Sequence, residues 1–211
     1  YEIGSGLVGS EMCIRDSGCG EPFAIERALV DNYQNYHDVQ IVNMLTLGDS
    51  PWCRPEMKGH FTLNCLFASQ SNRKAISLGV SEFTTSHFYE IPDLIKNYIR
   101  PRVTIVMVSP PDEHGYVSFG TTVDYTRGTA DYCDIKIAQV NKYMPRTFGN
   151  SFMHIRDFTC FVEHDEPLPE VKAVEISDTE MEIGKYCASL INDGDCLQLC
   201  LLYTSPSPRD R

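Results

Sequence analysis

Apolar residues along most of the chain follow two alternating patterns. Short continuous apolar runs such as 103–109 (VTIVMVS) are rich in β-branched residues, which is typical of strands buried on both faces of a sheet. Between these runs lie longer stretches in which apolar residues recur every three or four positions, as they do on one face of a helix. The alternation predicts an α/β fold with a mostly parallel sheet and flanking helices.

Local start and stop signals support the individual elements. Ser69 or Ser71 is expected to cap one helix and Gly79 to end it, while Ser177 and Glu180 form a predicted capping box at another. The expected helices cover residues 21–33, 71–79, 91–98, 124–132 and 178–191. The expected strands or extended segments cover residues 38–45, 61–67, 103–109, 134–141, 152–161 and 196–199.

Composition narrows the class of protein. The chain is 42% hydrophobic and carries a formal net charge of -11, which disfavours binding to nucleic acid or to anionic membrane surfaces. No apolar run is long enough to span a membrane, and the start of the chain has no signal-peptide pattern. The nine cysteines include no CxxC pair, so free thiols are expected rather than a metal site. These features predict a cytoplasmic protein without a bound metal.

The two ends of the chain share an unusual origin at the DNA level. One short DNA encodes residues 200–210 (CLLYTSPSPRD) on one strand and residues 7–16 (LVGSEMCIRD) on the other. That DNA resembles a transposase sequencing adapter. We therefore expect residues 1–17 and 200–211 to be adapter-derived, and the genuine protein to cover residues 18–199. The alternative is a pair of ordinary flexible tails.

Three segments that carry unusual residues border expected strands. They are Gly18–Pro22, Ser109–Tyr116 and Asn141–Thr147. In an open parallel sheet, ligands bind beyond the carboxyl ends of the strands. The sequence therefore predicts a ligand site built from these loops, without indicating which reaction takes place there.

Each candidate group in these loops has a functional and a structural interpretation. The glycine turn can offer backbone N–H groups to a carboxylate or phosphate, or it can be an ordinary turn before a helix. His114 can act as a general base oriented by Asp112, or the prolines beside it simply shape a loop. Arg146 can bind an anionic ligand or form a salt bridge within its loop. Cys19 can be a nucleophile or a packing residue.

The same loops carry a resemblance to a known family. The chain resembles the acetyl-CoA hydrolase/transferase family, in particular the acetate/butyrate and 4-hydroxybutyrate CoA-transferases. The similar stretches are GCGEP at 18–22, VSPPDEHGYVSFGTTVDYT at 108–126, AQVNKYMPRTFGNSFMH at 138–154, FVEHDEPLPE at 161–170 and IGKYCASLINDGDCLQL at 183–199. They cover most of residues 18–199.

The resemblance implies a two-domain enzyme with a NagB/RpiA/CoA-transferase-like fold. Its members move CoA between carboxylic acids, and a glutamate of the second domain forms a mixed anhydride and then a glutamyl-CoA thioester. Residues 18–199 would be an incomplete N-terminal domain that lacks this glutamate and is inactive alone. The family's first strand precedes GCGEP, where adapter-derived sequence is expected here, so the sheet is predicted to lack one strand. The full-length protein is expected to be a homo-oligomer.

The resemblance also implies which residues line the cleft. Residues 18–22 would line the acid or acyl pocket, and the other two loops would shape the cleft that faces the second domain. The expected substrate-binding residues are Gly18, Cys19, Gly20, Glu21, Pro22, Ser109, Pro110, Pro111, Asp112, His114, Gly115, Asn141, Met144, Pro145 and Arg146. Coenzyme A enters as a thioester substrate, beside a short-chain carboxylate, and no bound cofactor is expected. The alternatives are an acyl-CoA hydrolase and a non-catalytic ligand-binding domain of the same fold.

Overall fold

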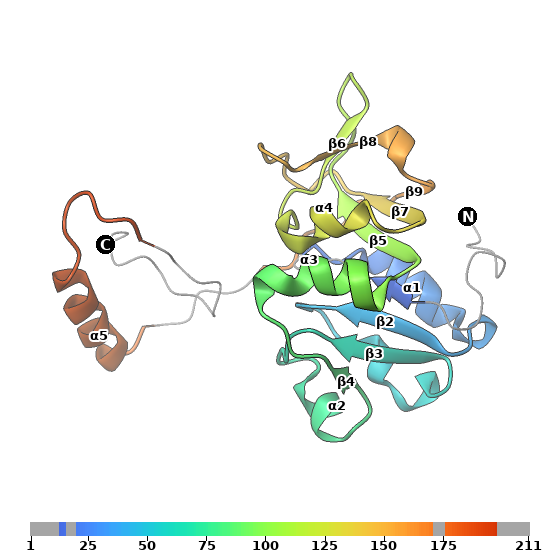
Figure 1. The fold of residues 1–211 in the computed structure, drawn as a ribbon, viewed down its shortest axis with the longest axis horizontal. Coiled ribbons are helices and arrows are strands. Elements are labelled where there is room, and N and C mark those ends of the chain that lie inside the picture. Colours follow the sequence, from blue (N-terminus) through green and yellow to red (C-terminus); the bar gives the residue numbers. More distant parts are fainter. Residues whose placement is uncertain (1–12, 16–19, 171–175, 198–211) are drawn as a thin grey trace. The chain divides into compact units, whose positions relative to one another are not determined.

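The chain divides into two compact units, residues 1–169 and residues 170–211. The computed structural model describes residues 13–15, 20–170 and 176–197 (Figure 1). The first unit contains a layered α/β fold, and the second contains helix α5 (Asp178–Ser189). Within the described residues, no helix is both long and apolar enough to cross a lipid bilayer.

A seven-stranded sheet forms the centre of the first unit, and all of its strand pairs are parallel. The strand order is β4-β3-β2-β1-β5-β7-β9. The strands are β1 (Cys13–Arg15), β2 (Val39–Asn43), β3 (Phe61–Cys65), β4 (Glu82–Phe83), β5 (Val103–Val108), β7 (Ile135–Val140) and β9 (Cys160–Glu163). Every residue of β5 is buried, as its continuous apolar run predicts. The expected α/β fold with a mostly parallel sheet is confirmed.

The expectation that the sheet lacks a strand is wrong. Strand β1 lies between β2 and β5, with Ile14 opposite both Ile41 and Val103. It therefore occupies the centre of the sheet, just before the glycine turn. Three residues suffice to bridge the two neighbours because backbone groups, rather than side chains, make the ladder. Whether residues 1–17 derive from an adapter remains a prediction.

Helices cover both faces of the sheet (Figure 1). Helix α1 (Phe23–Asp31) packs Ile25 and Leu29 against residues such as Ile41 of the sheet. The neighbouring Val42 contributes to a separate cluster with helix α3 (Ile91–Leu94). Successive strand residues point to opposite faces of a sheet, so Ile41 and Val42 serve different layers. Helix α3 continues into a π-helical turn over Ile95–Ile99, and α4 (Asp124–Ala130) joins it.

A small second sheet was not predicted as such. Strands β6 (Tyr116–Ser118) and β8 (Phe152–His154) pair antiparallel, with Val117 opposite Met153. Both of these residues are buried in a cluster with Phe119 and Phe158. The pairing joins two of the segments that the sequence singles out, the loop after β5 and the loop after β7. It thereby fixes the distance between them.

Helix boundaries differ from the sequence expectation mainly at α2 (Arg73–Ser77). Asn72 occupies the N-cap and makes no side-chain capping bond, so capping by Ser69 or Ser71 is wrong. The two serine hydroxyls lie 2.9 Å apart and bond to each other instead. Gly79 has a φ of +67° and follows the helix, as expected.

Helix α5 of the second unit begins as predicted. Ser177 accepts a hydrogen bond from the backbone of Glu180, and the Glu180 carboxylate accepts one from the backbone of Ser177. This reciprocal capping box satisfies two amides that the helix itself leaves unpaired. The expected final strand is not formed at Cys196 and Leu197, and its residues 198–199 lie outside the described part of the chain.

Candidate active-site edge

The three candidate loops lie at one edge of the sheet. They follow β1, β5 and β7, which are neighbours in the sheet and run parallel, so their carboxyl ends lie together. Strand order reverses between β1 and β5: β2, β3 and β4 extend the sheet to one side, and β5, β7 and β9 to the other. Ligands of open α/β sheets bind at such a reversal. Gly18 and Cys19 lie outside the described residues.

Met144 brings the glycine turn into contact with the loop after β7. A Cβ atom added at Gly20 would lie 2.8 Å from Met144 Cε and 2.8 Å from Thr122 Cγ2, so a side chain there would require both neighbours to move. Gly120 is closer still, because its Cβ would lie 2.2 Å from Met144 Sδ and 2.7 Å from the Pro145 carbonyl oxygen. The Met144 side chain is buried and fills the space between the two glycines. It is therefore a packing residue at this edge.

The carboxylate of Glu21 is fully buried. Its oxygens accept hydrogen bonds from the backbone N–H groups of Leu47 (3.0 Å) and Gly48 (3.1 Å). Backbone N–H donors compensate a buried negative charge and hold it in one orientation. Pro22 follows at the N-cap of α1, where its carbonyl accepts the amide of Ile25. Glu21 thus ties the glycine turn to the loop that follows β2.

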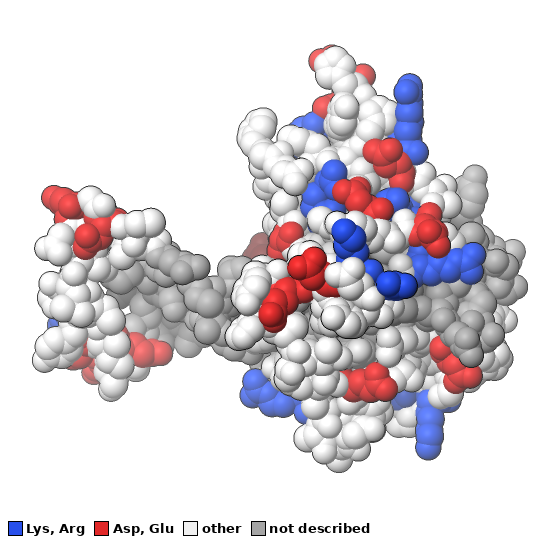
Figure 2. Space-filling model, in the orientation of Figure 1, with Lys and Arg blue, Asp and Glu red and all other residues white. Residues whose placement is uncertain are grey.

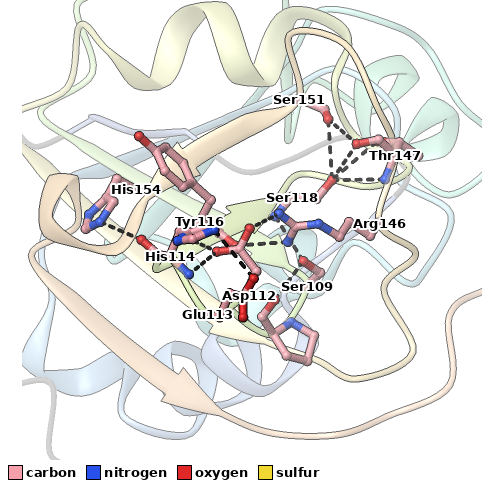
Figure 3. Close-up of polar contacts among 11 residues, drawn as sticks. Ser109, Asp112, Glu113, His114, Tyr116, Ser118, Arg146, Thr147, Ser151 and His154 are labelled. Carbon is pink, nitrogen blue, oxygen red and sulfur yellow. Dashed lines mark hydrogen bonds and ion pairs between the residues drawn. The ribbon is translucent and has the colours of Figure 1, made fainter.

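Asp112 and Arg146 join the loops after β5 and β7 (Figure 3). The Asp112 carboxylate accepts hydrogen bonds from the backbone of His114 (3.0 Å) and Tyr116 (2.8 Å), and pairs with the Arg146 guanidinium at 2.5 Å. Arg146 also donates to the Tyr116 carbonyl at 2.9 Å and stacks over the ring of Phe152. The Tyr116 amide, and then the His114 amide and the charge of Arg146, hold the pKa of Asp112 below its ordinary value.

Arg146 forms a salt bridge, as one of its two interpretations expects, and both of its terminal nitrogens bond within the protein. That Arg146 binds an anionic ligand stays a prediction. His114 does not form the expected pair with Asp112. The carboxylate bonds the backbone of His114, while the imidazole is 74% exposed and lies 3.5 Å from Glu113. Gly115 has a φ of +81°, which allows the tight turn between Asp112 and Tyr116.

Ser109 and Ser118 complete the inner part of the loop after β5. The Ser109 hydroxyl accepts the amide of Ser118 and donates to the Pro110 carbonyl. The Ser118 hydroxyl in turn accepts the amide of Gly120. It also accepts the amide of Thr147 (Figure 3). Pro110 and Pro111 provide no amide to these contacts, as proline has none. The hydroxyls therefore fix the shape of this loop against the loop after β7.

Sequence reasoning missed two residues of this edge, Gln139 and Glu166. Gln139 is fully buried in β7, and its side chain bonds the Ala24 amide at 2.9 Å and Glu166 at 2.7 Å. Asn141, which was expected here, bonds the backbone of Glu166 and the Tyr143 amide. The signal that points to Gln139 is a polar residue inside the apolar strand IKIAQV. A buried carboxamide in such a position requires partners.

No metal site is found among the described residues, and the Cys53 thiol is not activated. Among the described residues, no group of three or more His, Cys, Asp and Glu side chains lies close enough to hold a metal ion. Burial, reinforced by the nearby Cys65, raises the pKa of the Cys53 thiol to about 11. That thiol is protonated at neutral pH and is not activated as a nucleophile. On the face that Figure 2 draws, basic and acidic side chains are interspersed.

Comparisons with known proteins identify the class. The sequence model of the acetyl-CoA hydrolase/transferase N-terminal domain matches residues 4–172. The 4-hydroxybutyrate coenzyme A transferase of Clostridium kluyveri is 42% identical over 181 residues, which cover 85% of this chain and 42% of that protein. The butyryl-CoA:acetate CoA-transferase of Anaerostipes caccae is 28% identical over 190 residues, covering 84% and 41%. The matched range includes part of the segment for which an adapter origin is predicted.

Solved structures give the same class. RipA from Yersinia pestis superimposes with a TM-score of 0.84 and 26% identity, covering 91% of this chain and 47% of RipA. The 4-hydroxybutyrate CoA-transferase from Porphyromonas gingivalis gives a TM-score of 0.75 and 32% identity, covering 89% and 43%.

The fold is thus that of a CoA-transferase-type α/β domain. The chain belongs to the acetyl-CoA hydrolase/transferase family, and residues 4–172 correspond to the N-terminal domain. It spans 42% of the length of the Clostridium kluyveri relative.

Proposed function

We propose that this chain is the N-terminal part of a CoA-transferase that moves CoA between an acyl-CoA and a short-chain carboxylate. Acetate, paired with butyryl-CoA or 4-hydroxybutyryl-CoA, is the proposed substrate pair. The observation that carries the proposal is the 42% identity over 85% of the chain to a 4-hydroxybutyrate coenzyme A transferase. Coenzyme A enters only as a thioester substrate, and the proposal includes no other cofactor.

In the proposed reaction, a glutamate from the part of the protein that follows this chain acts as the nucleophile. Its carboxylate attacks the acyl-CoA thioester carbonyl, and CoA leaves as the thiolate, so that a mixed anhydride forms. The thiolate then attacks the glutamyl carbonyl and releases the first carboxylate. The second carboxylate attacks the carbonyl of the glutamyl-CoA thioester and displaces the CoA thiolate, which gives a new mixed anhydride. The thiolate then attacks the acyl carbonyl of that anhydride, so that the new acyl-CoA forms and the glutamate is released. The thioester is conserved throughout, provided that water is kept out.

The described residues have a shaping role in this proposal. Glu21 is bound to backbone amides and Asp112 to Arg146, so neither carboxylate is presented as the nucleophile. The glycine turn lies against the loop after β7, because Gly20 is in contact with the buried Met144 side chain. The reactive carboxylate is then supplied from outside the chain.

Recovery of the intact gene tests this proposal. The gene is amplified outward from the codons for Val108–Tyr125 in the original DNA, and the encoded protein is assayed with butyryl-CoA and acetate. We expect the reading frame to replace residues 200–211 with a second domain and the protein to form acetyl-CoA. Release of free CoA without transfer would favour the hydrolase. A natural gene that ends with CLLYTSPSPRDR would overturn both the adapter origin and the enzyme assignment, and would favour a ligand-binding domain.

A further inference from the structure

Glu166 lies where the chain leaves the sheet. It follows β9, which ends at Glu163, and precedes Pro169, where the first compact unit ends. Its side chain is only 15% exposed, whereas neighbouring Glu163 is exposed. A carboxylate with so little exposure to water needs hydrogen-bond or ion-pair partners. The partners of Glu166 show which segments of the chain it holds together.

The backbone of Glu166 is bound by one buried side chain. Asn141 donates from Nδ2 to the Glu166 carbonyl at 2.7 Å, and its Oδ1 accepts the Glu166 amide at 3.3 Å. Asn141 itself is fully buried at the end of β7. A carboxamide that binds both groups of one residue in this way replaces a pair of ladder bonds. The chain is therefore fixed against β7 after β9 has ended.

The side chain of Glu166 reaches helix α1. One carboxylate oxygen accepts Gln139 Nε2 at 2.7 Å, and the other accepts the Arg27 guanidinium at 3.0 Å. Gln139 Oε1 in turn accepts the backbone amide of Ala24 at 2.9 Å. The orientation of the Gln139 amide is fixed, because only its oxygen can accept from Ala24 and only its nitrogen can donate to Glu166.

One amide in the first turn of helix α1 has its hydrogen-bond partner in this network. The first amides of a helix have no partner inside the helix, and a side chain at the N-cap usually satisfies one of them. Pro22 occupies the N-cap of α1 and makes no such bond. Gln139, from a strand more than a hundred residues later, binds the Ala24 amide instead. A continuous chain of bonds thus joins Glu166 to the helix that follows the glycine turn.

We propose that Glu166 is a positioning residue that fixes the start of α1, and with it the glycine turn, relative to the point where the chain leaves the sheet. The proposal rests on the proposed function, because the glycine turn belongs to the edge at which the proposed transfer takes place. Buried hydrogen-bond networks with every group satisfied provide this kind of rigidity.

Amide hydrogen exchange on the 211-residue chain tests the proposal. We expect Glu166→Ala to raise the exchange rate of the Ala24 amide at least tenfold, while amides of β2 and β3 keep their protection. Glu163→Ala is the matched control, since it removes an exposed glutamate from the same segment, and it should leave Ala24 unchanged. Loosening confined to residues 163–167, or an equal effect of both variants, would overturn the proposal.

Glu166→Gln covers the case in which Glu166→Ala unfolds the protein. Glutamine is nearly the same size as glutamate, but its amide nitrogen would face either Gln139 or Arg27. Both of these groups donate hydrogen bonds, so one of the two bonds is lost. Exchange at Ala24 should therefore increase selectively, to a smaller extent, and unchanged protection would contradict the positioning role. In the whole enzyme, Glu166→Gln should lower kcat more than it changes KM for acyl-CoA. A whole enzyme without any transferase activity would refute the proposed function but leave the exchange result standing.

Discussion

Two polar contacts at the same edge of the sheet use similar groups in different surroundings. Asp112 and Arg146 join two loops at the surface, with 29% and 35% of their side chains exposed. Gln139 in strand β7 and Asn141 just after it hold Glu166, and both are fully buried. Water can replace a lost partner in the first contact but not in the second. We therefore expect burial, rather than charge, to decide which contact contributes more to the free energy of unfolding.

Removing the buried carboxamide at position 141 should produce the largest effect. Asn141→Ala leaves both backbone groups of Glu166 and the Tyr143 amide without their partner. We expect a loss of about 3 kcal/mol in the free energy of unfolding, measured by guanidinium denaturation. The control Asn150→Ala, at an exposed asparagine, should change it by less than about 0.5 kcal/mol. A loss below about 1 kcal/mol for Asn141→Ala would contradict the comparison.

Substitution of the second buried residue, Gln139, should cause the next largest loss in the free energy of unfolding. Gln139→Met preserves most of the volume but removes the bonds to Ala24 and Glu166. We expect a loss of about 2 kcal/mol, because a helix amide and a carboxylate oxygen lose a partner. A double-mutant cycle with Glu166→Ala should give a coupling energy above about 0.5 kcal/mol. Strict additivity would show that the two residues do not act together.

Substitution in the exposed contact between Asp112 and Arg146 should reduce stability less. Asp112→Asn keeps the shape of the loop but removes the charge that pairs with Arg146. We expect a smaller fall in the melting temperature than for Gln139→Met, and a difference from the wild type that shrinks in 1 M salt. A fall as large as that for Asn141→Ala, unaffected by salt, would reverse the ranking.

Acid should weaken the exposed contacts in a defined range. The pKa of Asp112 and that of Asp165 are both lowered from an ordinary value of 3.8, Asp112 chiefly by the Tyr116 amide and Asp165 chiefly by Lys142. A lowered carboxyl pKa stabilises the fold above the unfolded value, and this contribution is lost as the pH falls through the folded value. Melting temperatures measured from pH 7 to pH 3 should therefore fall below about pH 4. Asp112→Asn should show a shallower decline, and an identical profile would exclude Asp112 as a contributor.

The sequence predicted the elements that local pattern determines. Val103–Val108 is a continuous apolar run, and it forms a buried strand; Ser177 and Glu180 form the expected capping box. The three loops at the carboxyl edge also follow from pattern, because parallel strands place their ends together.

The partners of individual side chains could not be predicted. Glu21 binds amides of Leu47 and Gly48, which any sequence offers, and Gln139 binds an amide of α1. Backbone groups carry no sequence signal, so only the folded geometry shows these contacts. The capping of α2 failed for a related reason, since Ser69 and Ser71 satisfy each other. The strand at Cys13–Arg15 was missed because an adapter origin was taken to exclude a place in the sheet.

We propose that the whole protein transfers CoA between carboxylates at the edge formed by the loops after β1, β5 and β7. Isotope exchange tests it most directly: labelled acetate is incubated with acetyl-CoA and the protein encoded by the intact gene, and label in acetyl-CoA is measured. We predict that label enters acetyl-CoA faster than free CoA appears, because the thioester passes through the protein without meeting water. Release of CoA without incorporation of label would contradict the account.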